Sequence, residues 1–103
     1  EAVAYYQQLA GQASERVADT LEKIVPAASD GRVETLFLAS GVQQWGVFNP
    51  VTNEIELHSQ QEAGDEPLLD LAAVQTYLKG GIVYAMEPEK VPGGTFAAAV
   101  LRY

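Results

Sequence analysis

The chain has 103 residues, a size that fits one compact domain with its own hydrophobic core. It contains no cysteine, which excludes disulfides, thiolate metal sites and a cysteine nucleophile. Six basic residues stand against fourteen acidic ones, and the net charge of −8 argues against non-specific binding to nucleic acid or to an anionic membrane.

The N-terminal residues predict one helix followed by an ambiguous segment. Apolar residues recur at helical spacing over Glu1 to Gln12, which favours a helix. The segment Ser14 to Ala18 fits two alternatives, a short strand around Val17 or the lead-in to a second helix.

A second helix and a buried strand come next. Asp19 or Thr20 is a suitable N-cap for a helix that runs to about Ser29. Val33 to Ala39 is predicted to be a strand, and the consecutive apolar residues 36–38 indicate that both of its faces are covered.

The middle of the chain predicts a β-hairpin. Its strands are Gln44 to Phe48 and Glu54 to His58, and the turn-forming residues 49–53 separate them. Because side chains alternate along a strand, Ile55 and Leu57 face one way. The opposite face of the same strand then carries Glu54, Glu56 and His58.

A third helix is predicted after the hairpin. Asp65 caps it, Glu66 and Pro67 lie in its first turn, and the glycines at 80 and 81 end it. The apolar residues of this helix place one face toward the core, consisting of Leu68, Leu71, Ala72 and Leu78 and broadened by Leu69, Ala73 and Tyr77.

Two further strands, Ile82 to Met86 and Phe96 to Arg102, complete the predicted elements. The mixture of helices and strands predicts an α/β domain, a three-layer α/β/α sandwich with a central mixed sheet. We expect all five strands in that one sheet. The predicted core includes Leu36, Leu38, Leu71, Val83 and Val100.

Few residues of this sequence are candidates for chemistry. It contains no phosphate-binding loop, dinucleotide fingerprint, nucleophile elbow or zinc-protease motif, and it has a single histidine. The strand face of Glu54, Glu56 and His58 could supply two carboxylates and an imidazole to a metal. The alternative, which we favour, is a solvated outer face of the hairpin. We therefore predict that the chain holds no metal or cofactor and has no catalytic activity.

Three other features have both a functional and a structural interpretation. Trp45 could be an exposed binding aromatic, although filling the core is the favoured interpretation. Gly93 and Gly94 could approach a ligand, and a tight turn into the last strand is favoured. Arg32 and Arg102 flank buried strands, where each is expected to pair with an acidic neighbour.

Three blocks of sequence together resemble one known family. They are Ala27 to Leu38, with Gly31-Arg32-Val33-Glu34-Thr35-Leu36; Leu69 to Tyr84; and Gly93 to Tyr103, which ends in Leu101-Arg102-Tyr103. They resemble the C-terminal domain of the archaeal and eukaryotic class I peptide-chain release factors and of Pelota. The Gly31-Arg32-Val33 turn and the Trp45-Gly46 hairpin are most similar to the bacterial relatives. The resemblance covers about residues 20 to 103.

The resemblance implies a fold like that of the kink-turn-binding ribosomal proteins. In full-length relatives this domain follows a central domain whose Gly-Gly-Gln loop promotes peptidyl-tRNA hydrolysis. Neither glycine pair of this chain continues into glutamine, since Ile82 and Thr95 follow them. The partners implied are other domains of its own chain, a translation GTPase and the ribosome. No individual contact residue is carried over from the family.

The first hypothesis is therefore a non-catalytic protein-interaction domain of a bacterial release-factor-like or Pelota-like protein, working in the cytoplasm. Residues 1–103 are expected to be one domain at the C-terminal end of a longer protein, because the chain lacks an initiator Met. Residues 1–19 would be its N-terminal helix and lead-in. The alternatives are RNA binding, which the acidic charge disfavours, and a small metal-dependent enzyme using Glu54, Glu56 and His58.

Overall fold

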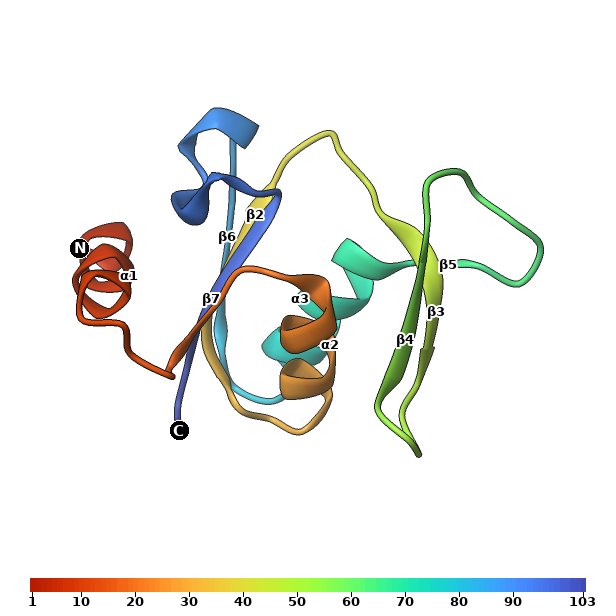
Figure 1. The fold of residues 1–103 in the computed structure, drawn as a ribbon, viewed down its shortest axis with the longest axis horizontal. Coiled ribbons are helices and arrows are strands. Elements are labelled where there is room, and N and C mark those ends of the chain that lie inside the picture. The colour runs from red at the N-terminus through yellow and green to blue at the C-terminus, as the bar shows by residue number, and fades with distance from the viewer.

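The computed structural model describes all 103 residues and arranges them in successive layers (Figure 1). Helix α1 (Ala2–Gly11) lies on one side of a four-stranded sheet, and helices α2 (Leu21–Ser29) and α3 (Leu68–Leu78) lie on the other. A three-stranded sheet forms a further layer outside α2 and α3. The predicted α/β sandwich with a mixed sheet is confirmed, and this outer sheet is an addition to it.

The four-stranded sheet holds the centre of the fold. Its strand order is β1 (Val17–Ala18), β7 (Ala97–Leu101), β2 (Val33–Ala39) and β6 (Ile82–Met86). Strand β2 is parallel to β6 and antiparallel to β7, so the sheet is mixed as predicted. The apolar run in β2 has both faces covered, because Leu36 joins the core under α2 and α3 while Phe37 joins the cluster under α1.

The hairpin strands do not belong to the central sheet, which corrects the prediction of one five-stranded sheet. Strands β3 (Trp45–Asn49) and β4 (Glu54–His58) form a separate sheet with the short strand β5 (Glu66–Pro67), in the order β4-β3-β5. Strand β2 already pairs with β6 and β7 and has no free edge. The hairpin instead packs its inner face, with Phe48 and Ile55, against the helix-side core.

The start of α3 also differs from the prediction. Asp65 does not cap this helix, and Glu66–Pro67 pair with Trp45–Gly46 instead of forming the first helical turn. The helix begins at Leu68, whose N–H donates to the Gln44 carbonyl at 2.8 Å. The Leu69 N–H donates to the Gln43 side-chain oxygen at 3.0 Å. Gln44 and Gln43, just before β3, therefore accept hydrogen bonds from the first two amides of α3, which have no acceptor within the helix.

The buried face of α3 is rotated from the predicted one. Leu68, Leu69, Ala72 and Thr76 are buried, Leu71 is half-buried, and Leu78 is 71% exposed. Strand β6 lies at the edge of its sheet, so Val83 is also only half-buried. The burial predicted for Leu36, Leu38 and Val100 is confirmed.

The remaining segments agree with the sequence. The short strand of the two alternatives is present at β1, and Thr20 occupies the N-cap position of α2. Two 3-10 turns, η1 (Pro88–Lys90) and η2 (Pro92–Gly94), connect β6 to β7. Gly93 has φ of +87°, and a Cβ there would meet the Tyr6 hydroxyl at 3.1 Å, so this glycine serves a tight turn against α1. No helix is long and apolar enough to span a membrane.

Candidate functional site

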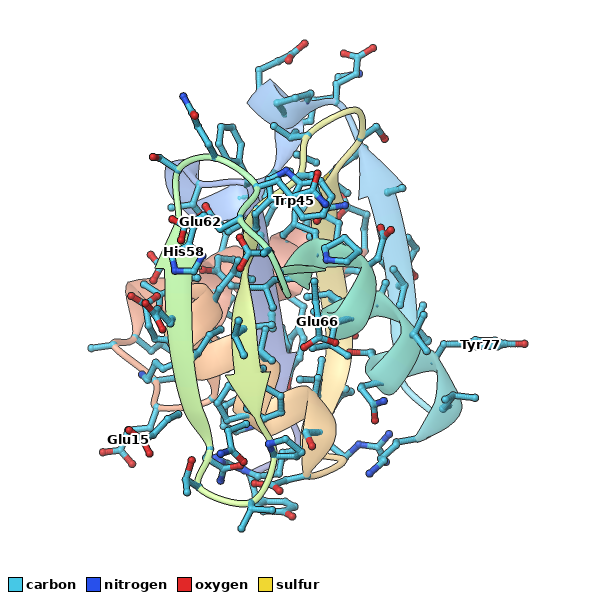
Figure 2. All side chains as sticks on the ribbon, turned by 90° about the vertical axis from the view of Figure 1, so that its right-hand side faces the viewer. Glu15, Trp45, His58, Glu62, Glu66 and Tyr77 are labelled. Carbon is cyan, nitrogen blue, oxygen red and sulfur yellow. The ribbon has the colours of Figure 1, made fainter.

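The candidate site is the outer face of the hairpin sheet, on the side turned away from α2 and α3 (Figure 2). The register pairs Trp45 with His58 and Val47 with Glu56. Side chains alternate along each strand, so these four residues share one face while Phe48 and Ile55 lie on the core side. The predicted alternation places Glu56 and His58 outward and Ile55 inward, but the outer face also carries the apolar Trp45 and Val47, and Leu57 on the inner face is 38% exposed.

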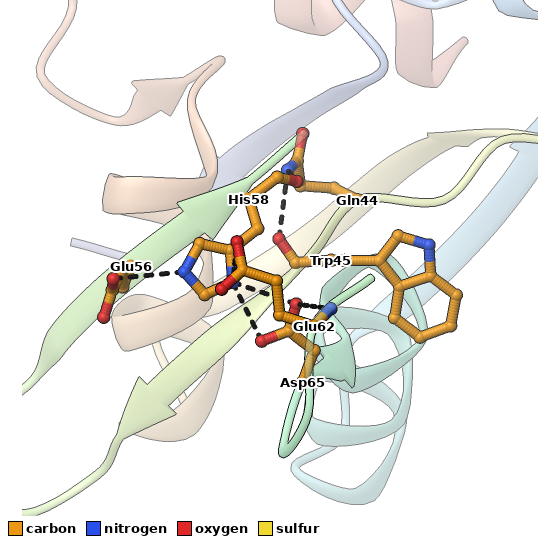
Figure 3. A network of polar contacts seen from close by, with 6 residues as sticks. All are labelled: Gln44, Trp45, Glu56, His58, Glu62 and Asp65. Carbon is orange, nitrogen blue, oxygen red and sulfur yellow. Dashed lines mark hydrogen bonds and ion pairs between the residues drawn. The ribbon is translucent and has the colours of Figure 1, made fainter. Parts of the chain in front are cut away.

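His58 lies at the C-terminal end of the edge strand β4 and contacts three carboxylates (Figure 3). Its Nδ1 is 2.9 Å from each carboxylate oxygen of Asp65 and 3.8 Å from Glu62 Oε2. Its Nε2 is 3.1 Å from Glu56 Oε1. The imidazole thus bridges strand β4 and the loop that leads into β5.

These contacts favour the charged imidazolium. The hydrogen bond with Asp65 and then that with Glu56 raise the pKa of His58 to about 9, and the charges of Asp65 and Glu62 add to the effect, while burial opposes it. At neutral pH both ring nitrogens therefore carry a proton and both donate.

Asp65 is the buried member of the cluster, with no exposed side-chain surface. Burial alone would raise the pKa of its carboxyl, but the hydrogen bonds from His58 and from the Glu62 N–H, together with the His58 charge, lower it. The Glu62 N–H donates to Asp65 Oδ2 at 2.8 Å, and the Asp65 N–H donates back to the Glu62 carbonyl at 3.0 Å. Asp65 thereby closes the loop 59–65 on itself and fastens it to β4.

This arrangement acts as a clasp between β4 and the loop 59–65. While both ring nitrogens are protonated, the imidazole has no lone pair with which to accept a proton or bind a metal. Glu54, the third residue of the predicted ligand set, makes no contact with His58. The structure contains no group of three or more His, Cys, Asp or Glu side chains placed to hold a metal. The absence of metal stays a prediction that elemental analysis can test, and the absence of catalysis stays a prediction as well.

Trp45 does not fill the core, which corrects the favoured interpretation. It is half-buried on the outer face and belongs to neither apolar core cluster. Its position is fixed through the backbone, because the Gln44 side-chain amide donates to the Trp45 carbonyl at 3.1 Å and to the His58 carbonyl at 2.8 Å. The indole extends to the side opposite the His58 ring (Figure 3).

The two arginines predicted to meet acidic neighbours bind carbonyl groups instead. Arg32 Nη2 donates to the Tyr103 carbonyl at 3.0 Å, and its guanidinium lies 5.3 Å from the Tyr103 ring centroid. Arg102 Nη2 donates to the Lys79 carbonyl at 3.0 Å, at the C-terminal end of α3. These contacts fix the C-terminus and do not form part of the candidate site.

Sequence reasoning singled out Glu56 and His58 but missed the contacts of His58 with Asp65 and Glu62. His58 and Asp65 are seven residues apart, and in a strand followed by a loop no periodic rule predicts that residues at this separation come into contact. Gln43 and Gln44 carried no signal, because their partners at the start of α3 lie about 25 residues further along the chain. Only the cluster of acidic residues around the lone histidine was visible in the sequence.

Comparison with known proteins finds similarity in the fold of this chain. No protein-family model matches the sequence, and no curated protein is significantly similar to it. Among solved structures, the chain is similar to the C-terminal domain of a peptide chain release factor from Methanosarcina mazei, with a TM-score of 0.72 and 13% sequence identity. The alignment covers 99% of this chain and 79% of that chain. The fold is thus that of a release-factor C-terminal domain.

Proposed function

We propose that this chain is a non-catalytic protein-interaction domain of a translation-associated protein of the release-factor and Pelota type, in its bacterial branch. The observation that carries the proposal is the fold match to a release-factor C-terminal domain over 99% of the chain. The three sequence blocks that resemble the family give a second, independent support. In this proposal, residues 1–103 form the C-terminal domain of a longer protein, and any peptidyl-tRNA hydrolysis belongs to another domain.

The outer face of the hairpin sheet is the surface we assign to the partner. It combines a half-buried tryptophan and the 39% exposed Val47 with a rim of carboxylates at Glu54, Glu56 and Glu62. Tryptophan is enriched among the residues that dominate binding energy at interfaces. The His58 clasp holds this face in one conformation, which lowers the entropy cost of docking. The acidic rim favours a basic partner surface, such as that of a translation GTPase or a ribosomal protein.

Binding to purified bacterial ribosomes and to translation GTPases tests the proposal. We expect the chain to cosediment with ribosomes or to bind a GTPase at physiological salt, with a Kd of roughly micromolar order for a transient interface. Val47→Lys on the outer face should weaken binding at least about tenfold. Val51→Lys, the same change at the 90% exposed hairpin tip, is the matched control and should leave binding intact.

Two outcomes would contradict the proposal. Absence of binding to every ribosomal and GTPase sample at about 100 µM would reject the translation-associated role. Binding that Val47→Lys leaves unchanged would reject the outer face as the docking surface while leaving the role itself standing.

A further inference from the structure

Strand β6 is an edge strand without the usual protection of such edges. It lies at the end of the strand order β1-β7-β2-β6, so its outer side pairs with nothing in the chain. Exposed edges in soluble monomers commonly carry lysine, proline or a bulge that prevents another strand from pairing. The sequence of β6 is Ile82-Val83-Tyr84-Ala85-Met86, with no charge and no proline, and its pairing with β2 is regular.

Exposed apolar side chains flank this edge on both faces of the sheet. On the side of α1, Ile82 is 54% exposed, and Tyr84 is 40% exposed although its ring stacks on Phe37 at 5.7 Å. On the side of α3, Tyr77 and Leu78 are 68% and 71% exposed, and Tyr77 points away from the body of the molecule (Figure 2). A shallow apolar hollow on this side is lined by Ala73, Val74, Tyr77, Leu78 and Val83.

The backbone of β6 also offers free hydrogen-bonding groups. The Met86 carbonyl accepts from the Ser40 N–H at 2.8 Å, so the polar groups of Met86 point toward β2. Backbone groups alternate between the two sides of a strand, which turns those of Ile82 and Tyr84 inward as well. The N–H and C=O groups of Val83 and Ala85 therefore point outward, where another strand can pair with them.

The charges at the two ends of β6 have opposite sign. Lys79 and Arg102 lie at its N-terminal end, where the Arg102 guanidinium contacts the Lys79 carbonyl. Glu87 and Glu89 follow its C-terminal end, with only Glu87 near a lysine, 3.8 Å from Lys90. An identical strand laid antiparallel along this edge brings the basic end of each copy to the acidic end of the other.

We propose that two copies of this chain form a symmetric dimer through antiparallel pairing of their β6 strands. A two-fold axis at Tyr84 places Val83 of each copy opposite Ala85 of the other, so their outward groups hydrogen-bond, and sets Ile82 against Met86. The two four-stranded sheets then become one continuous sheet. The two-fold axis uses the β6 edge of both copies, and the other edge of this sheet, β1, has just two residues, so the assembly stops at two copies.

The overall charge of −8 does not prevent this contact. The strand itself is uncharged, and the acidic residues elsewhere in each copy are screened over about 8 Å at physiological salt. The dimer surface lies along β6, at the edge of the four-stranded sheet opposite β1, and is separate from the outer face of the hairpin sheet. The inference therefore goes beyond the proposed function and does not depend on it.

Sedimentation equilibrium of the purified chain tests the dimer directly. We expect a mass of twice 11.1 kDa at high concentration, with a dissociation constant of roughly 10 µM for an interface of this modest size. Ile82→Lys should raise that constant at least about tenfold, because the pairing covers Ile82 with Met86 of the other copy and a lysine ammonium there would lose hydration, while the half-exposed site in the monomer stays undisturbed. Val51→Lys adds the same charge at the hairpin tip and should have no effect.

Amide hydrogen exchange distinguishes strand pairing from side-chain contact alone. The Val83 and Ala85 amides should exchange fast in the Ile82→Lys variant and slowly in the wild-type dimer, while amides of β2 stay protected in both. A wild-type chain that remains at 11.1 kDa well above 100 µM overturns the proposal and assigns the edge to another protein or segment. A dimer that Ile82→Lys leaves intact, or that leaves the Val83 and Ala85 amides unprotected, overturns it equally.

Discussion

His58 illustrates how a single side chain holds a loop that has no regular structure of its own. Its ring joins Glu56 on β4 to Asp65 at the end of the loop 59–65, and Asp65 in turn binds the Glu62 amide. The clasp consists of charge-assisted hydrogen bonds, which are stronger than neutral ones. Its strength therefore depends on the protonation of one imidazole.

The raised pKa of His58 predicts a pH-dependent stability. The imidazole has a pKa near 6.5 when unfolded and about 9 when folded, so folding favours its protonated form. The stabilisation is fully present below pH 6.5 and is lost as the pH rises from 6.5 through 9. NMR titration of the ring protons should give a midpoint near 9, and the thermal midpoint should fall over the same range.

Asp65→Asn is the informative variant for this effect. It removes the main charged partner, so the pKa of His58 should move back toward 6.5 and the loss of stability above pH 6.5 should flatten. Glu54→Gln neutralises a carboxylate on the same strand that does not touch His58 and serves as the control. A wild-type His58 that titrates near 6.5 would show that the clasp is open in solution.

Gly46 is a second residue whose identity the packing dictates. A Cβ at this position would clash with the Glu56 carbonyl of the paired strand and approach Leu68 Cδ1 at 2.9 Å. We expect Gly46→Ala to lower the free energy of unfolding by at least about 1–3 kcal/mol, because the backbone of β4 must move to make room for the methyl group. Gly11→Ala, at the end of α1, is the matched control, since its Cβ would meet no atom of another part of the chain within 4 Å. It should leave the free energy of unfolding unchanged or raise it by up to about 1 kcal/mol in denaturant unfolding, because alanine favours helix over glycine.

At the scale of the element, α3 is apolar on nearly all sides, and this explains why its buried face was assigned wrongly. Leucine, alanine, valine or tyrosine occupies positions around the whole helix, so periodicity alone favours no single face. The packing of α3 against α2, β2 and the hairpin selects Leu68, Leu69, Ala72 and Thr76. The last turn, with Tyr77 and Leu78, extends beside the open edge strand.

Two leucine truncations in α3 test this assignment. Leu68→Ala should lower the free energy of unfolding by about 2–5 kcal/mol, because its side chain is fully buried. Leu78→Ala removes the same atoms from a 71% exposed position and should cost less than about 0.5 kcal/mol. Urea unfolding of the two variants at one pH gives the comparison. Equal losses would mean that the last turn of α3 is buried, as the sequence pattern suggested.

At the scale of the whole molecule, the charge bears on the RNA-binding alternative raised from the sequence. A net charge of −8 repels the phosphates of RNA. Of the six basic residues, Arg16 pairs with Glu34, and Arg32, Lys79 and Arg102 bind backbone carbonyls. The remaining cations do not form a patch that could follow a nucleic-acid backbone.

We therefore expect RNA binding to be absent or very weak. The chain should bind a kink-turn RNA no more tightly than roughly 10⁻⁴ M at physiological salt, which is the range of non-specific contacts. Fluorescence anisotropy with a labelled kink-turn, and with a duplex of equal length as control, measures this. Sub-micromolar binding that weakens steeply with salt and prefers the kink-turn would restore the RNA-binding alternative.

Local sequence determined the elements of this protein, and tertiary structure decided how they combine. Alternation along Glu54 to His58 and the apolar run of β2 were visible because their causes lie within a few residues. The separate hairpin sheet, the capping of α3 by Gln43 and the clasp between His58 and Asp65 were not, because each depends on a contact between segments whose spacing follows no periodic rule. Trp45 lies on the outer face for the same reason: alternation defines two faces of a hairpin, and only packing against α2 and α3 decides which one is buried.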